Sequence, residues 1–136
     1  MYLLDTNVIS ELRKDTRAHR KVQAWQATVP RATMLLSSVT IMELKIGVLL
    51  KERKDPQQAA IFREWLEKVV LVEFQNRILH IDTQVALRCA SLHVPKTRSY
   101  RDAFIAATAL EHGLTVVTRN VADFEGTGAA IVNPWK

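Results

Sequence analysis

Four acidic residues occupy matching positions along the chain, where short apolar runs give way to helix starts: Asp5, Glu43, Asp102 and Asp123. An open α/β sheet gathers such junctions at one edge, at the carboxyl ends of its strands. Two like charges ~5 Å apart repel by on the order of 3 kcal/mol at an effective dielectric of ~20. A shared divalent cation would offset this repulsion, and Mg²⁺ and Mn²⁺ prefer carboxylate and water oxygens. The pattern therefore predicts a magnesium or manganese site.

Helix capping is the competing interpretation of each acid. The spacing Thr40-x-x-Glu43 matches a capping box, and Asp102 and Asp123 stand at the same spacing after a possible N-cap residue. Taken singly, capping is the stronger interpretation of each acid. Asp5 is harder to explain in this way, because two competent caps follow it directly. The joint placement of all four at one predicted sheet edge favours the metal site.

Small polar residues accompany the acids along the chain. They are candidates for orienting the carboxylates or an attacking water, as neighbours of metal ligands do: Thr6, Asn7, Ser38, Thr118 and Asn120. Thr and Asn are also routine turn residues, and for Ser38 that interpretation is stronger.

Composition limits the classes of protein and of site that are compatible with the chain. Its 136 residues suffice for a single domain over residues 1–136, and no apolar stretch reaches the ~18 residues of a membrane span. The N-terminus lacks the features of a signal peptide, so we expect a cytoplasmic protein with no membrane partner. A net charge of +5 suits a polyanion ligand, although it also keeps a small protein soluble. Cys89 is the single cysteine, which excludes an internal disulfide and a zinc site built from cysteines, and we expect it to be buried. The four histidines lack the spacing of zinc ligands.

Strand-like and helix-like segments alternate along the chain. Predicted strands cover residues 2–4, 34–37, 77–81, 114–118 and 130–132, and predicted helices cover 7–12, 18–28, 40–54, 56–69, 82–93 and 102–112, with a helical turn at 120–124. Ser99 is the expected cap and Gly113 the expected stop of the helix before residue 114. The alternation predicts an α/β fold, a three-layer α/β/α arrangement around a parallel sheet of four to five strands.

Four stretches carry a resemblance to a known family: LDTNVISEL at 4–12, SSVTIMEL at 37–44, RDAFIAATALEHGLTVVTRNVADF at 101–124, and the closing GTGAAIVNPW. Together they resemble the PIN-domain ribonucleases, specifically the VapC/FitB-like toxins of bacterial toxin–antitoxin pairs. The matching stretches cover roughly half of the chain and reach both ends, so the set is specific although a lone D-T-N would not be. Residues 14–31 and 51–76 are the least family-like.

The resemblance implies a PIN-like fold and a metal site for Mg²⁺ (or Mn²⁺) on the same four acids. It assigns Thr118 and Asn120 to a T-x-N-x-x-D stretch that supports the water, and Asn7 to the position beside the first acid. It further implies a homodimer, a cognate antitoxin that forms a higher assembly with it, and DNA contact only through that antitoxin. Antitoxins of this group often place a basic side chain in the acidic pocket.

The leading functional hypothesis is a metal-dependent endoribonuclease. Ions held by Asp5, Asp102 and Asp123, with Glu43 as ligand or water-positioning base, would promote in-line attack of water on an RNA phosphate. Candidates for holding the RNA backbone are the basic residues Arg13, Lys96, Arg98, Arg101 and Arg119, each of which is individually more typical of a solvated surface cation. The tryptophans at positions 25, 65 and 135 are more typical of a core or a dimer interface than of base stacking.

Two other classes of function remain open. Asp5 follows a strand, as the nucleophile of an aspartate-dependent phosphatase does, but Asn7 stands where the second acid of that pattern would be. The acids would alternatively belong to a binding module without catalysis, in which they cap helices and bind an arginine-bearing partner.

Overall fold

The computed structural model describes residues 1–136 and contains one sheet of five parallel strands in the spatial order β3-β2-β1-β4-β5. The strands are β1 (Tyr2–Leu4), β2 (Met34–Ser37), β3 (Ile78–Leu79), β4 (Thr115–Val117) and β5 (Ala130–Val132). The first strand of the chain is thus central, with β2 and β4 as its neighbours. Because the strands are parallel, the carboxyl ends of β2, β1 and β4 lie side by side at one edge. The predicted parallel sheet is confirmed.

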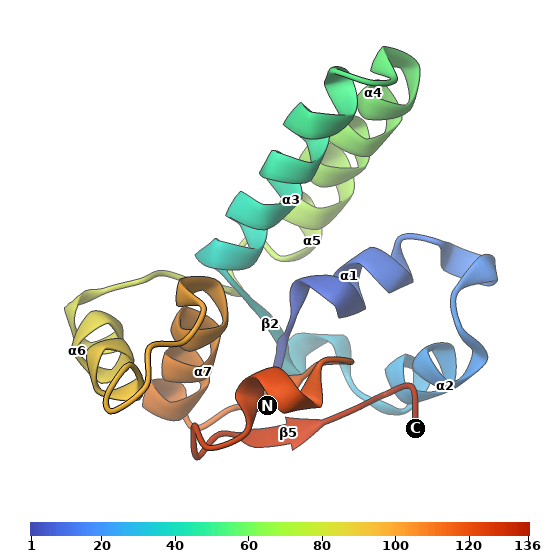
Figure 1. The fold of residues 1–136 in the computed structure, drawn as a ribbon. Coiled ribbons are helices and arrows are strands. Elements are labelled where there is room, and N and C mark those ends of the chain that lie inside the picture. Colours follow the sequence, from blue (N-terminus) through green and yellow to red (C-terminus); the bar gives the residue numbers. More distant parts are fainter.

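Helices lie on both sides of this sheet, which confirms the predicted three layers (Figure 1). On one side lie α6 (Thr83–Leu92) and α7 (Tyr100–His112), and on the other lie α1 (Thr6–Leu12) and α2 (Arg20–Thr28). The long α3 (Ser38–Glu52) packs against α4 (Pro56–Trp65), and together they project from the sheet as a hairpin. Shorter helical segments are η1 (Asp15–Arg17), η2 (Arg31–Thr33), η3 (Leu66–Val70), α5 (Leu71–Glu73) and η4 (Val121–Phe124). No helix combines the length and the apolar character that a bilayer crossing requires.

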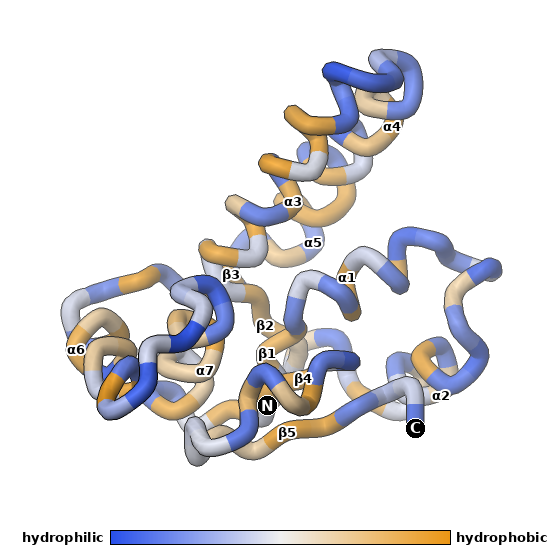
Figure 2. Tube along the Cα trace, in the orientation of Figure 1, coloured by the Kyte–Doolittle hydropathy of each residue, from blue (hydrophilic) through white to orange (hydrophobic).

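Alternating side chains of the strands form the two layers of the core. Leu4 and Val117 belong to the cluster under α1 and α3, whereas Leu3 and Val116 belong to the cluster under α7. All four are fully buried, and Figure 2 shows the strands as hydrophobic segments at the centre of the molecule. Strands that are apolar on both faces are typical of a parallel sheet covered by helices. Cys89 is also buried, as expected, in a smaller cluster between α6 and α7.

The helix expected to begin at Thr40 begins two residues earlier. Ser37 is its N-cap, and the Ser37 hydroxyl accepts a hydrogen bond of 3.0 Å from the backbone N–H of Val39. Thr40 therefore lies inside the first turn, fully buried and with a hydroxyl that has no hydrogen-bond partner. The predicted capping box from Thr40 to Glu43 is wrong, because the end of β2 already supplies a cap.

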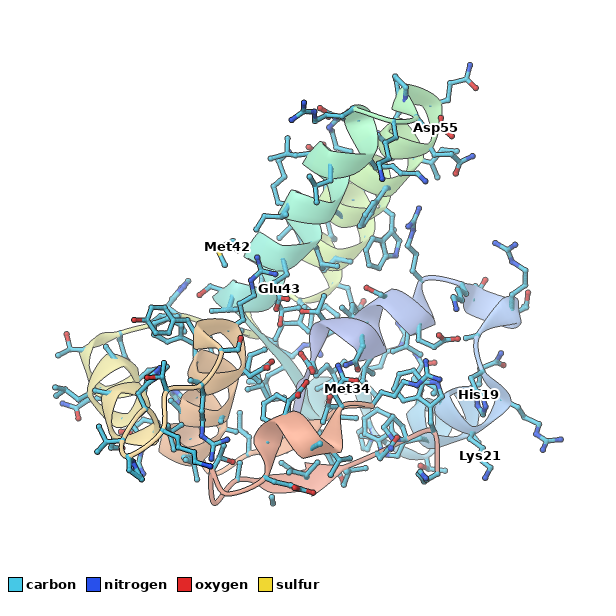
Figure 3. All side chains as sticks on the ribbon, viewed as in Figure 1. His19, Lys21, Met34, Met42, Glu43 and Asp55 are labelled. Atoms are coloured by element: carbon cyan, nitrogen blue, oxygen red, sulfur yellow. The ribbon has the colours of Figure 1, made fainter.

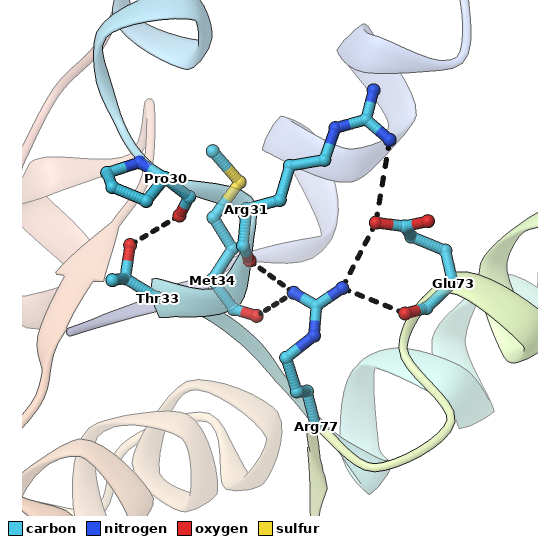
Figure 4. A network of polar contacts seen from close by, with 6 residues as sticks. All are labelled: Pro30, Arg31, Thr33, Met34, Glu73 and Arg77. Atoms are coloured by element: carbon cyan, nitrogen blue, oxygen red, sulfur yellow. Dashed lines mark hydrogen bonds and ion pairs between the residues drawn. The ribbon is translucent and has the colours of Figure 1, made fainter.

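The third strand is shorter than expected, although the backbone N–H of Leu36 in β2 still donates to the carbonyl of Arg77. Its guanidinium donates to the backbone carbonyls of Arg31, Met34 and Glu73, and it pairs with the Glu73 carboxylate (Figure 4). This network joins the start of β2 to the end of α5. Arg77 thus anchors the entry to β3, and the strand itself is confined to residues 78–79.

Candidate active site

Asp5 lies at the centre of the carboxyl edge of the sheet, directly after β1. It is the N-cap of α1, and its Oδ1 accepts a 2.8 Å hydrogen bond from the backbone N–H of Thr6. Its Oδ2 accepts one bond from the Thr118 hydroxyl at 2.8 Å and another from the Asn7 side-chain amide at 3.2 Å. Its own N–H donates to the carbonyl of Val117. Asp5 is only 6% exposed, so the first acid is a buried carboxylate fixed from two neighbouring strands.

Glu43 reaches the same edge from the second turn of α3, near the base of the helical hairpin (Figure 3). Its Oε1 accepts a 2.9 Å hydrogen bond from the hydroxyl of Thr6. Its Oε2 lies 3.6 Å from a terminal guanidinium nitrogen of Arg101 on α7. Because Thr6 contacts both Asp5 and Glu43, the structure brings these two acids together although 38 positions separate them.

Asp102 and Asp123 approach this pair from α7 and η4. Asp102 stands in the first turn of α7, after a loop rather than after a strand, and Asp123 stands in the first turn of η4, which follows β4. The expected cap residues Ser99 and Asn120 occupy the N-cap positions but make no side-chain capping bond. Capping therefore accounts for Asp5 and gives no account of the other three acids.

Burial and neighbouring carboxylate charges raise the pKa values of Asp5, Glu43 and Asp102. Burial, followed by the charges of Asp123, Asp5 and Glu43, raises the pKa of Asp102 to about 6, against the opposing charge of Arg101. Burial also raises the pKa of Asp5, which hydrogen bonds from Thr118 and Thr6 lower and the charge of Asp123 raises further. For Glu43, burial again raises the pKa, and the charge of Asp5 adds to it while Thr6 and Arg101 oppose it. Such mutual repulsion in a partly buried site is typical of functional carboxylates.

The carboxylates are near neighbours without forming a closed cage. No group of three or more His, Cys, Asp or Glu side chains stands at metal-binding geometry as the side chains lie. The donor set is nevertheless made of carboxylate oxygens, with hydroxyls and an amide beside them and no sulfur or imidazole ligand. That chemistry fits a hard cation such as Mg²⁺ or Mn²⁺, which keeps several waters and takes one or two carboxylates together with substrate phosphate.

The predicted supporting residues divide into two groups. Thr6, Asn7 and Thr118 contact the acids through their side chains, and Thr118 also accepts bonds from the Asn7 amide and from the backbone N–H of Asn120. Asn120 reaches this network only through its backbone. Ser38 is the first residue of α3, and its side chain makes no hydrogen bond to an acid.

The basic candidates are spread more widely than the acids. Arg101 pairs with Glu43 and so lies at the acids. Arg119 reaches the acidic network through its backbone N–H, which donates to Asn7 Oδ1, while its guanidinium packs over Trp135. Arg98 is engaged elsewhere, since its guanidinium donates to the carbonyl of Leu92, and Lys96 is exposed in the same loop.

Arg13 is not brought to the acids. It is the C-cap of α1, eight residues or on the order of 12 Å along the helix from Asp5. Its guanidinium packs over the rings of Phe62 and Trp65 and lines a separate hollow of about 520 Å³, which Arg77 also lines.

Each of the three tryptophans packs against a different side chain. Trp25 packs edge-on against Tyr2, Trp65 packs near Phe62, and Trp135 lies under the Arg119 guanidinium. All three are partly buried, and Trp25, Trp65 and Trp135 pack against the same core cluster. These contacts agree with the core role in the prediction of a core or a dimer interface.

Sequence reasoning missed the contact between Arg101 and Glu43. It treated Arg101 only as a candidate for RNA contact, whereas the structure makes it the counter-ion of an acid on another helix. Its place directly before Asp102 was the available signal, because a cation there must lie within one helical turn of the acidic cluster.

Comparison with known proteins agrees with this arrangement. The profile of the PIN domain matches residues 2–128. A VapC ribonuclease of Sinorhizobium fredii is 38% identical, and the alignment covers 100% of this chain and 99% of that protein. The crystal structure of FitAcB from Neisseria gonorrhoeae matches with a TM-score of 0.89 and 36% identity, covering 99% of both chains. A toxin–antitoxin complex from Klebsiella pneumoniae matches with a TM-score of 0.70 and 26% identity over 100% of this chain and 99% of that one. By fold and by sequence, this chain belongs to the PIN-domain family.

Proposed function

We propose that this chain is a divalent-metal-dependent endoribonuclease and the toxin of a toxin–antitoxin pair, acting on RNA in the cytoplasm. The observation that carries the proposal is the gathering of Asp5, Glu43 and Asp102 at one sheet edge with their pKa values raised. Carboxylates whose pKa values are raised in this way, even beside Arg101, would be stabilised in their charged form by a bound cation. The related ribonuclease and toxin–antitoxin complex support the choice of RNA as substrate and of an antitoxin as partner.

Asp5, Glu43, Asp102 and Asp123 would hold the ion, Mg²⁺ or Mn²⁺. When bound, the ion would supply charge neutralisation at the scissile phosphate and Lewis acidity toward the attacking water. Thr118 and Asn7 fix Asp5 in one rotamer, and Thr6 does the same for Glu43. Because burial and the charge of Asp5 raise the pKa of Glu43, its carboxylate is suited to accept a proton from water. Arg101 and Arg119 would contact the phosphates of the bound RNA strand.

The geometry gives no support to an aspartate nucleophile. Asn7 stands where the second acid of the phosphatase pattern would be, and its side-chain amide donates to Asp5 Oδ2. An amide cannot act as the general acid that protonates a leaving group. A phosphatase is therefore a weaker candidate than a nuclease that uses water.

The partner proposal follows from charge. An antitoxin that places an Arg or Lys side chain among these acids would supply the positive charge that an ion otherwise gives, with charge-assisted hydrogen bonds. We propose a homodimer that forms a higher assembly with its antitoxin, with DNA contacted only through the antitoxin.

Cleavage of single-stranded RNA with and without divalent metal tests the function. We expect Mg²⁺ or Mn²⁺ to be required, and Asp5→Asn and Asp102→Asn each to abolish cleavage while the far-UV circular dichroism stays that of the wild type. Titration with each metal would identify the preferred ion. Undiminished cleavage by either variant, or full activity in EDTA, would refute the assignment. Growth arrest on induction, relieved by the neighbouring gene, would test the toxin role.

A further inference from the structure

A shallow cavity of about 490 Å³ adjoins the acidic cluster between the start of α3 and the start of α7. Its lining includes Met42 on α3 and Tyr100, Arg101 and Phe104 on α7. Arg101 belongs to both places, because it lines the cavity and lies 3.6 Å from Glu43 Oε2. Met42 and Glu43 are consecutive residues near the base of the hairpin (Figure 3). A ligand in this cavity would therefore extend directly into the acidic cluster.

Two of the lining side chains are large, apolar in part and open to solvent. Tyr100 is 68% exposed and Met42 is 48% exposed. The Tyr100 ring is not loose, because the ring of His93 packs edge-on against it with centroids 4.9 Å apart. The backbone N–H of Arg98 in turn donates to His93 Nδ1 at 3.2 Å. The fold thus holds an aromatic ring in place while leaving most of it uncovered.

We propose that this cavity is a subsite for one unpaired nucleobase of the RNA substrate, beside the phosphate that is cleaved. Tyr100 is the stacking surface, Met42 is the opposing apolar wall, and Arg101 faces the adjoining phosphate. This inference rests on the proposed ribonuclease function and adds a substrate contact to it.

The chemistry of the cavity matches a nucleotide at both ends. A nucleobase is flat and aromatic, and stacking on an aromatic side chain is the usual way in which proteins hold single-stranded RNA. Its attached phosphate is anionic, and the cavity has its cation, Arg101, on the side of the acids. Phe104, which is partly buried and packs against the core under α7, supplies an apolar floor. A purely apolar partner segment would leave Glu43 as the only anionic partner of the Arg101 guanidinium.

The test compares Tyr100→Ala with Tyr100→Phe, which keeps the ring, and with Leu87→Ala, which removes an equally exposed apolar side chain on α6 outside the cavity. Steady-state cleavage of an unstructured fluorescent RNA in Mn²⁺ gives kcat and KM. Fluorescence anisotropy of the same RNA, with Asp102→Asn as the inactive background, gives the dissociation constant. Loss of one stacked base is expected to weaken binding about tenfold. We expect this loss, in KM and in the dissociation constant, for Tyr100→Ala only.

A second RNA, with the base beside the mapped cleavage point removed, makes the test specific. On that RNA, Tyr100→Ala and the wild type should bind equally, because there is no base left to stack. An unchanged KM for Tyr100→Ala, or a tenfold loss that persists on the abasic RNA, would overturn the subsite. A change in the oligomeric state of Tyr100→Ala, measured by light scattering together with the loss of affinity, would also overturn the subsite. The cavity would then belong to an interface between two copies of the chain. If the wild type cleaves RNA and Tyr100→Ala has the same KM and dissociation constant, only the subsite is refuted. If the wild type does not cleave RNA, the proposed function is refuted.

Discussion

Replacing Asp102 by Asn should stabilise the metal-free protein while it abolishes activity. Burial and the neighbouring acids raise the pKa of Asp102 from 3.8 to about 6. The charged form is therefore disfavoured in the folded state, and the full difference between the two pKa values corresponds to about 3 kcal/mol. Asp102 is partly exposed, so solvent screening reduces the expected gain for Asp102→Asn to about 1–2 kcal/mol. Asn is nearly isosteric and removes the charge alone.

The gain should depend on pH with a definite sign. Below pH 3.8 the Asp102 carboxyl is protonated in both the folded and the unfolded states, so Asp102→Asn gives no advantage. Between pH 3.8 and about 6 the folded state binds more protons than the unfolded state, and wild-type stability falls as the pH rises. Above about 6 the penalty is fully present, and the advantage of the variant should be constant.

Urea unfolding in EDTA at several pH values between 4 and 8 measures this difference, and thermal melts with added Mn²⁺ measure its reversal. In EDTA we expect the variant to melt about 3–6 °C above the wild type at pH 8. With Mn²⁺ at 100 times its dissociation constant, the wild type should gain about 2.7 kcal/mol and the variant much less. The order of the two melting temperatures should then invert.

Asp82→Asn is the matched control. Asp82 is the N-cap of α6, and its carboxylate accepts from the backbone N–H of Val85. Asn caps a helix about as well as Asp, so this variant should change neither stability nor the response to Mn²⁺. If Asp102→Asn were no more stable than the wild type in EDTA at pH 8, or gained as much from Mn²⁺, the reasoning from shared charge would fail.

Three further predictions concern the groups around the acids. Thr118→Val removes the hydroxyl that donates to Asp5, so it should lower the free energy of unfolding by about 1–2 kcal/mol and weaken Mn²⁺ binding. Thr118→Ser keeps the hydroxyl and should keep both the stability and the Mn²⁺ affinity. Equal Mn²⁺ binding isotherms for the two variants would contradict this role. Mn²⁺ affinity measured by calorimetry should rise with pH and level off above about pH 6, because Asp102 must lose its proton to bind the ion. An affinity that stays constant between pH 5 and 7 would contradict this role of Asp102. Ser37→Ala removes the cap of α3 and should reduce stability by about 1 kcal/mol without changing the rise in melting temperature on adding Mn²⁺, which urea and thermal unfolding would measure.

The positions of the acids were predictable because they depend on local pattern. Apolar runs at 2–4, 34–37 and 130–132 predict the strands, and the structure confirms these three segments with the same bounds. Gly113 ends α7 in the left-handed conformation with φ of 66°, which a residue without a side chain adopts readily. Once the strands are known to be parallel, their carboxyl ends must share an edge.

The local sequence pattern does not decide which of several suitable residues caps a helix, and details of the site depend on that choice. Ser37, Ser38 and Thr40 are all competent caps, and Ser37 is selected because it ends a strand whose register with β1 and β3 is fixed by packing. The helix expected over 56–69 likewise continues to residue 73, because Leu66 and Val70 are buried in the core shared with β1 and β2.

The sequence alone therefore predicted the fold class and the four candidate acids, since both predictions rest on patterns spaced along the chain. Only the tertiary structure decided that Thr6 joins Asp5 to Glu43, that Arg101 faces Glu43, and that Arg13 belongs elsewhere. These contacts join residues far apart in the chain, and their geometry depends on how the helices pack on the sheet.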